Sequence, residues 1–154
     1  MIPGCGTAHE VIRAFCTAGF AVRAIDFSPI AVQETKTALG PLADNVLLGD
    51  FFHYDFDRTR FDIVYERTFL CALSPERWKE YGARVAELLR PGGRLAGIFF
   101  YGEEDDPPPY PLNDRRAREV FAEHFRLDRS DAVTDSLPVF AGNERWQEWI
   151  SVAD

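Results

Sequence analysis

Two glycines one residue apart stand near the start of the chain, in the stretch Ile2-Pro3-Gly4-Cys5-Gly6-Thr7-Ala8. Because glycine has no Cβ, the backbone can turn sharply here and approach a ligand closely. The helical pattern that begins at Ala8 would direct its free N–H groups at the same point. The stretch therefore predicts a strand–turn–helix site for a nucleotide-like cofactor, with a plain tight turn as the alternative.

Three acidic residues follow predicted strands in a way that fits such a cofactor. Asp26 stands 22 positions after Gly4, where a carboxylate can accept hydrogen bonds from ribose hydroxyls. Asp50 is expected beside the base, with Phe51 covering an adenine ring, and Glu66 over the reacting end of the cofactor. The alternatives are solvated strand ends for the two aspartates and, for Glu66, an ion pair with Arg67.

The residues after the glycines distinguish between cofactors. A dinucleotide fingerprint requires a third glycine where this chain has His9, and a phosphate-binding loop requires a Gly-Lys-Ser/Thr that is absent. A turn that ends in Ala8 suits S-adenosylmethionine (SAM), which has no pyrophosphate to approach. The sequence therefore favours SAM over NAD.

Hydrophobic periodicity and turn signals predict strands that alternate with helices. We expect helices over about 8–18, 29–39 (capped by Ser28) and 75–90 (capped by Ser74), and a further helix that is capped by Asp114 and includes Phe125. Strands are expected over 21–25, 45–48, 61–66, 95–101, 127–133 and 144–152. Pro91-Gly92-Gly93 should separate helix from strand, and the acidic run 103–106 should be a solvated loop. The fold class is α/β, with a doubly wound, mostly parallel Rossmann-like sheet, an antiparallel edge hairpin at the C-terminus and a single domain over residues 1–154.

Composition limits the partners. The chain has 154 residues and a formal net charge of −8, which disfavours nucleic acid and anionic membrane surfaces. The three cysteines indicate reduced thiols in a cytoplasmic protein, with Cys5 and Cys71 as small buried side chains. His9, His53 and His124 have no metal-ligand spacing, so no metal is expected.

Several segments together resemble the thiopurine S-methyltransferase family of class I SAM-dependent methyltransferases, which includes halide and thiol methyltransferases. The matching segments are Pro3-Gly4-Cys5-Gly6, the run from Ile25 to Val32, Gly49-Asp50-Phe51-Phe52, the run from Phe61 to Leu73, Leu88 to Gly93, Pro108-Pro109-Tyr110, and Phe140 to Trp146. The resemblance covers nearly the whole chain. Family members carry several dozen further residues before the glycine turn, including a strand and a tryptophan-bearing segment, which this sequence does not contain.

The resemblance implies roles for individual residues. Arg67 is the expected catalytic residue, near the methionine part of SAM and near the substrate, whose anion it would favour. Halide enzymes have tyrosine there and thiopurine enzymes arginine, so a thiol or other anionic small molecule is favoured over halide. Phe69 and Tyr110 are expected to line the substrate pocket. The implied cofactor-binding residues are Gly4, Cys5, Gly6, Asp26, Phe27, Asp50, Phe51 and Glu66.

The predicted function is methyl transfer from SAM to sulfur or a related soft nucleophile of a small molecule, by positioning and without a dedicated acid–base residue. The alternative is a truncated methyltransferase-fold domain that binds SAM weakly or has a structural role. Thiols, thiopurines and oxyanions of selenium or tellurium all stay open as acceptors, and so does the oligomeric state.

Overall fold

The computed structural model describes residues 1–103 and 107–152, and its chain divides into two compact units, Met1–Arg58 and Thr59–Asp154. Residues 104–106 of the predicted acidic loop lie outside the described residues. The prediction of one domain over residues 1–154 stays a prediction. Among the described residues, no helix is both long and apolar enough to cross a membrane.

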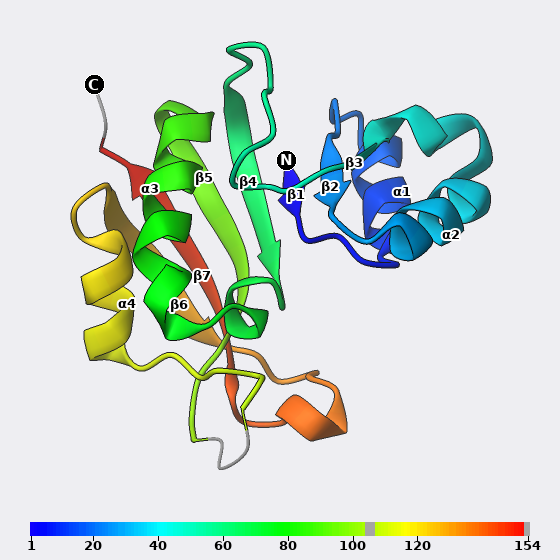
Figure 1. Ribbon diagram of the computed structural model, residues 1–154. Helices are drawn as coiled ribbons and strands as arrows, with labels where there is room; N and C mark the ends of the chain where they lie inside the picture. The colour runs from blue at the N-terminus through cyan, green and yellow to red at the C-terminus, as the bar shows by residue number, and fades with distance from the viewer. Residues whose placement is uncertain (104–106, 153–154) are drawn as a thin grey trace. The chain divides into compact units, whose positions relative to one another are not determined.

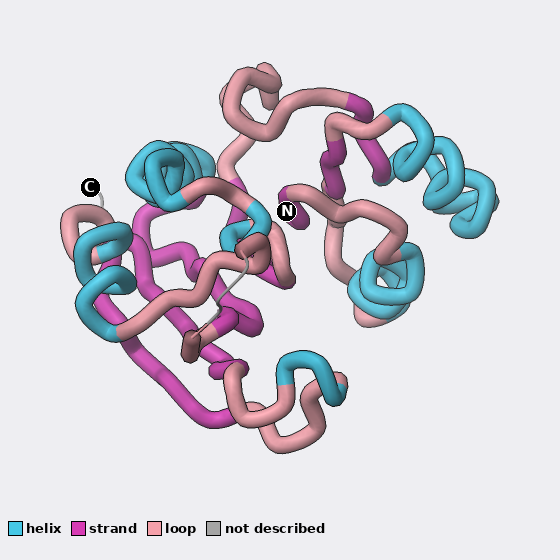
Figure 2. The backbone as a smooth tube through the Cα atoms, turned by 60° about the horizontal axis from the view of Figure 1, so that its bottom comes forward, coloured by secondary structure: helices cyan, strands magenta, loops and turns pink. Residues whose placement is uncertain are grey.

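The first unit is a parallel sheet with two α-helices (Figure 1). Its strands are β1 (Ile2–Pro3), β2 (Ala24–Asp26) and β3 (Val46–Leu48), in that spatial order, and its helices are α1 (His9–Thr17) and α2 (Pro29–Leu39), with a 3₁₀ segment over Gly40–Asn45. The Ser28 hydroxyl accepts a hydrogen bond from the Ala31 N–H at 3.3 Å, which confirms the predicted cap of α2. In Figure 2 the short magenta strands of this unit run beside its cyan helices.

The second unit is a mixed sheet with two α-helices on one of its faces (Figure 1). Its elements are β4 (Phe61–Arg67), α3 (Trp78–Leu88), β5 (Leu89–Phe100), α4 (Asp114–Phe121), β6 (Phe125–Ala132) and β7 (Glu144–Ser151), with 3₁₀ segments over Leu70–Ala72, Pro75–Arg77 and Pro138–Phe140. The strand order is β4-β5-β7-β6, in which β4 and β5 are parallel and β7 is antiparallel to both β5 and β6. The α/β class, the parallel strands and the antiparallel C-terminal pair are confirmed.

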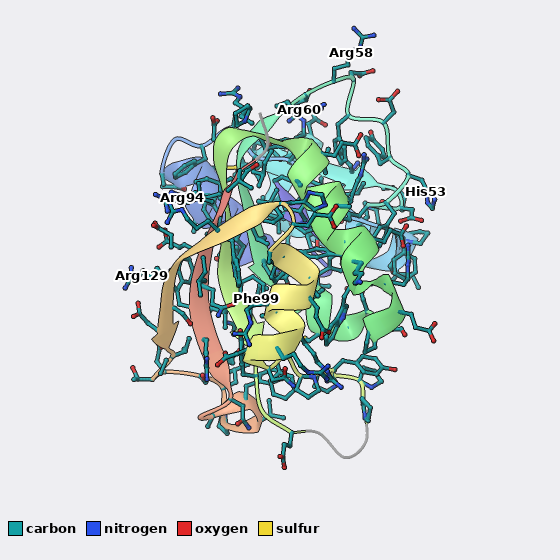
Figure 3. The ribbon with its side chains drawn as sticks, turned by 90° about the vertical axis from the view of Figure 1, so that its left-hand side faces the viewer. His53, Arg58, Arg60, Arg94, Phe99 and Arg129 are labelled. Atoms are coloured by element: carbon teal, nitrogen blue, oxygen red, sulfur yellow. The ribbon has the colours of Figure 1, made fainter. Side chains whose placement is uncertain are left out.

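Aromatic rings join the helices of the second unit to its sheet. Phe99 of β5, labelled in Figure 3, meets Phe121 of α4 edge-on with ring centroids 5.9 Å apart. Phe121 also meets Tyr81 of α3 at 6.4 Å and Trp149 of β7 at 4.9 Å. Arg94 and Arg129 lie on the other side of this sheet, away from α3 and α4 (Figure 3).

Several predicted boundaries were wrong. The strand predicted over 21–25 begins only at Ala24. Ser74 makes no side-chain cap, and a 3₁₀ turn precedes α3. Pro91-Gly92-Gly93 lies inside β5, where the register between β4 and β5 shifts. Asn113 caps α4 in place of Asp114, because its side-chain oxygen accepts the Arg116 N–H at 2.9 Å. Phe125 belongs to β6, since α4 ends at Phe121.

Candidate functional site

The glycine turn, residues 4–7, connects β1 to α1 in the first unit. Gly4 and Gly6 have φ values of 55° and 49°, a left-handed conformation that glycine adopts without steric cost. A Cβ built on Gly6 would meet no atom within 4 Å, so open space borders the turn there. Both glycines thus have the backbone geometry expected of a turn that approaches a ligand.

Asp26, at the end of β2, supports this turn directly. Its Oδ2 accepts the Gly6 N–H at 2.8 Å, and its Oδ1 accepts the Ser28 N–H at 2.9 Å. The residue is 9% exposed. A carboxylate has about four lone-pair sites, so Asp26 keeps acceptor capacity for a ligand after these two bonds.

Thr35 of α2 holds the same turn from the other side and was missed by sequence reasoning. Its hydroxyl donates to the Gly6 carbonyl at 2.8 Å, and the residue is fully buried. A signal was available, because Thr35 falls between Val32 and Leu39 on the buried stripe of α2, where a polar side chain needs a partner.

Asp50 follows β3 and is brought near Asp26 through the backbone, since the Gly49 N–H donates to the Asp26 carbonyl at 2.9 Å. The Asp50 carboxylate accepts the Phe52 N–H at 3.0 Å and lies 2.8 Å from Nδ1 of His53. Asp50 is therefore close to the turn that Asp26 supports.

The two aromatic residues predicted for the cofactor differ in exposure. Phe51 is 3% exposed, and its ring packs edge-on against Phe52. Phe27, directly after Asp26, is 76% exposed. Of the two, only Phe27 has an exposed ring.

Glu66 is fully buried at the end of β4 in the second unit, and described neighbours engage both of its carboxylate oxygens. Its Oε1 accepts the N–H groups of Phe69 and Leu70 at 2.8 and 3.0 Å, and its Oε2 accepts the Tyr81 hydroxyl at 2.7 Å. Burial raises the pKa of Glu66 above its usual value, although these hydrogen bonds oppose the shift. Glu66 shapes the turn after β4, where Thr68 has a φ of 62°.

Arg67 pairs with Glu144, the first residue of β7, rather than with Glu66. The Arg67 Nη2 to Glu144 Oε1 distance is 3.7 Å, with the side chains 31% and 3% exposed. The other oxygen of Glu144 is buried and has no hydrogen-bond partner within the described part of the chain. Glu144 was also missed, because 77 residues separate it from Arg67 and only the fold brings the two together.

A small cavity at the carboxyl ends of β4 and β5 lies within the second unit. Its lining includes Glu66, Thr68, Cys71, Phe100, Tyr110 and Leu112. Tyr110 lines this cavity, and its N–H donates to the Cys71 carbonyl at 2.7 Å. That Tyr110 lines a substrate pocket stays a prediction. Phe69 is not among the lining residues; its ring meets Tyr81 edge-on at 6.0 Å.

Cys5 and Cys71 are buried, as predicted, and neither is activated as a nucleophile. Burial, assisted by the negative charge of Asp26, raises the pKa of the Cys5 thiol to about 12. Burial and the charge of Glu66 raise the pKa of Cys71 to about 12 as well. Both side chains therefore stay protonated near neutral pH.

The chain matches the family model "Thiopurine S-methyltransferase (TPMT)" over residues 1–151. It is 30% identical over 118 residues to "Probable thiol methyltransferase 2" of Arabidopsis thaliana, covering 73% of this chain and 51% of the relative. It is 29% identical over 153 residues to "Thiopurine S-methyltransferase" of Vibrio parahaemolyticus, covering 85% of this chain and 69% of the relative.

A solved structure shares the fold. The Burkholderia thailandensis 1,6-didemethyltoxoflavin-N1-methyltransferase, with bound 1,6-didemethyltoxoflavin and S-adenosylhomocysteine, superposes with a TM-score of 0.74 at 19% identity, covering 99% of this chain and 71% of that one. This chain spans about half the length of the Arabidopsis relative and about two thirds of the Vibrio relative. Because the family model matches residues 1–151, the chain belongs to the thiopurine S-methyltransferase family.

Proposed function

We propose that this chain is a SAM-dependent methyltransferase that acts on sulfur or a related soft nucleophile of a small molecule. The observation that carries the proposal is the glycine turn, left-handed at Gly4 and Gly6 and tied to the carboxylate of Asp26, in a chain of this family. Such a turn at the carboxyl end of a parallel strand is where open α/β sheets bind cofactors.

The residues of the first unit fit the adenosine part of SAM. Asp26 keeps lone pairs for ribose hydroxyls after accepting its two backbone N–H groups. The exposed ring of Phe27 offers an apolar surface for adenine, and Asp50 lies one residue beyond the Gly49 N–H that binds the Asp26 carbonyl. We assign the cofactor's methionine part to Gly4, Cys5 and Gly6.

The residues of the second unit fit an acceptor that is positioned rather than deprotonated. SAM, when bound, would supply a methyl group on a sulfonium sulfur. A thiolate could attack the methyl carbon directly, with S-adenosylhomocysteine as the leaving group. Glu66 already accepts three hydrogen bonds, and the two buried cysteines stay protonated, so none of the three is poised as a base. Arg67 uses one side of its guanidinium for Glu144 and keeps other N–H donors for an acceptor anion. Tyr110 lines the small cavity at the carboxyl ends of β4 and β5.

Calorimetry with S-adenosylhomocysteine tests the cofactor proposal. We expect saturable binding by the wild-type chain and its loss in Asp26→Ala, whereas Asp44→Ala, which removes a carboxylate elsewhere in the same unit, should bind like the wild type. Absence of heat at high ligand concentration with the wild type would instead support a domain that binds SAM weakly or serves a structural role.

Methyl transfer assays then test the acceptor class. We expect product from small thiols, with a rate that rises as the thiol ionises and stays flat above the thiol's own pKa. A basic limb that disappears when one side chain is replaced would contradict positioning catalysis. Product formed from an amine and from no sulfur, selenium or tellurium acceptor would contradict the soft-nucleophile proposal.

A further inference from the structure

We propose that Thr35 is a positioning residue for the cofactor: its hydroxyl, acting through the Gly6 carbonyl, sets the conformation of the glycine turn that binds SAM. The inference rests on the proposed function. It adds a residue from the middle of α2 to a site that family resemblance and sequence spacing place only at strand ends.

The geometry shows Gly6 held on both of its backbone polar groups. Its N–H donates to Asp26 Oδ2 at 2.8 Å, and its carbonyl accepts the Thr35 hydroxyl at 2.8 Å. One bond comes from the end of β2 and the other from α2, so two separate elements fix one left-handed residue. Thr35 is fully buried, which excludes water as a substitute partner on its side.

The orientation of the Gly6 carbonyl also fixes the orientation of the next backbone N–H, that of Thr7. The carbonyl of Gly6 and the N–H of Thr7 belong to one planar trans peptide group and point in opposite directions. Because Thr35 draws the carbonyl toward α2, the Thr7 N–H is directed away from α2. Thr35 thereby orients a donor in the turn without touching the ligand itself.

Thr35→Val is the informative substitution, because valine keeps the shape and loses only the hydroxyl. The substitution removes the 2.8 Å hydrogen bond to the Gly6 carbonyl and leaves it only the weak Cys5 thiol donor at 3.8 Å. The restoring variant is Thr35→Ser, which retains the hydroxyl. The matched control is Thr37→Val on the same helix, where an exposed hydroxyl donates to the Gln33 carbonyl of its own helix at 2.8 Å.

The measurements are the Kd for S-adenosylhomocysteine, the KM for SAM and the midpoint of urea unfolding. We expect Thr35→Val to weaken ligand binding and raise the KM about fivefold or more, with kcat little changed. Thr35→Ser should restore most of the affinity, and Thr37→Val should bind like the wild type. Because the Kd is measured on protein shown to be folded by its urea transition, lower stability alone does not move it.

The outcomes separate the two proposals. If the wild type does not bind S-adenosylhomocysteine, the proposed function fails, and this inference fails with it. If the wild type binds and folded Thr35→Val binds equally well, Thr35 is only a core residue and the inference alone is overturned. If Thr35→Val does not fold, Thr35→Ser against Thr35→Ala decides the matter, since equal affinities of those two would overturn the inference.

Discussion

Asp26 and Glu66 share one role at the scale of residues: each carboxylate accepts two backbone N–H groups of nearby turns. Asp26 accepts those of Gly6 and Ser28, and Glu66 those of Phe69 and Leu70. A carboxylate used in this way fixes turn geometry, since hydrogen bonds donated to a charged acceptor are stronger than those between neutral groups. Asp26 retains partial exposure, whereas Glu66 is closed off by the Tyr81 hydroxyl.

The burial of Glu66 predicts a pH dependence of stability. Its folded-state pKa lies above the unfolded value, because burial outweighs the three hydrogen bonds. The stability that Glu66 contributes is therefore fully present below the unfolded pKa and is lost as the pH rises through the folded pKa. We expect the free energy of unfolding of the wild type, relative to Glu66→Gln, to fall as the pH increases above about 4.5.

Urea unfolding at a series of pH values checks this. Glu87→Gln, which changes an exposed carboxylate on α3, is the control and should show no comparable trend. The prediction would be contradicted if the free energy of unfolding of the wild type, relative to Glu66→Gln, stayed constant or increased as the pH rises.

The Arg67–Glu144 pair predicts energetic coupling between β4 and β7. Replacing Arg67 by methionine leaves the buried Glu144 charge without its partner and should destabilise the chain by about 2 kcal/mol. The double variant with Glu144→Gln should recover about 1 kcal/mol of that loss. A double-mutant cycle measured by urea unfolding tests this, with Arg115 and Glu119 as an exposed reference pair expected to couple by less than about 0.5 kcal/mol. Additive effects at Arg67 and Glu144 would exclude the coupling.

Residues whose role follows from local spacing were predictable, and those whose role depends on distant partners were not. The position of Asp26 at the end of a strand could be predicted because it stands a fixed distance beyond the glycine turn, while its contact with ribose stays a prediction. For Thr35 the sequence signals only a buried polar side chain on α2, and for Glu144 it signals nothing. Their partners are 29 and 77 positions away, and only the packed fold shows them. Phe51 was placed at the cofactor by its position after Asp50, but sequence does not reveal that its ring is buried while that of Phe27 is exposed.

At the scale of elements, the order of strands and helices was predictable, and their ends were less so. Ser28 and Pro29 mark the start of α2 unambiguously, because both the cap and the proline fit only there. In isolation, Pro91-Gly92-Gly93 predicts a break between helix and strand. In the structure, pairing with β4 already begins at Leu89, so this segment lies inside β5, at a shift of register. Tertiary pairing thus overrides local turn signals at this point.

The close approach of α3 and α4 gives a prediction for Gly82. A Cβ at this position would lie 2.5 Å from the Val120 carbonyl oxygen of α4, closer than packed atoms allow. Alanine normally stabilises a helix interior by about 1 kcal/mol relative to glycine. Here we expect the clash to reverse the sign, so that Gly82→Ala destabilises the chain by about 1–2 kcal/mol.

Thermal and urea unfolding measure this effect, and Lys79→Ala on the exposed side of the same helix serves as the control for helix propensity. Gly82→Ala as stable as the wild type, or more stable, would show that α3 and α4 do not pack as closely as the structure has them.

At the scale of the whole molecule, the two units differ in how much structure each holds. The first has strands of two or three residues and two helices, and the second has a four-stranded sheet with strands of seven to twelve residues. A unit of about 60 residues buries only about 60% of the surface of its unfolded chain and is marginal alone. The proposed cofactor residues Gly4, Gly6 and Asp26 all belong to this smaller unit.

Because the first unit is marginal alone, we expect it to unfold together with the second, as a single domain would. Hydrogen exchange tests this prediction. Under conditions in which exchange reports equilibrium opening, the most protected amides of β2 and of β5 should give the same free energy of opening, equal to that from urea unfolding. S-adenosylhomocysteine at 100 times its Kd should raise both values together by about 2.7 kcal/mol, because a ligand that binds only the native state stabilises the entire cooperative unit. A lower value for β2 than for β5, with the ligand raising β2 alone, would show that the first unit opens separately and would replace one domain by two.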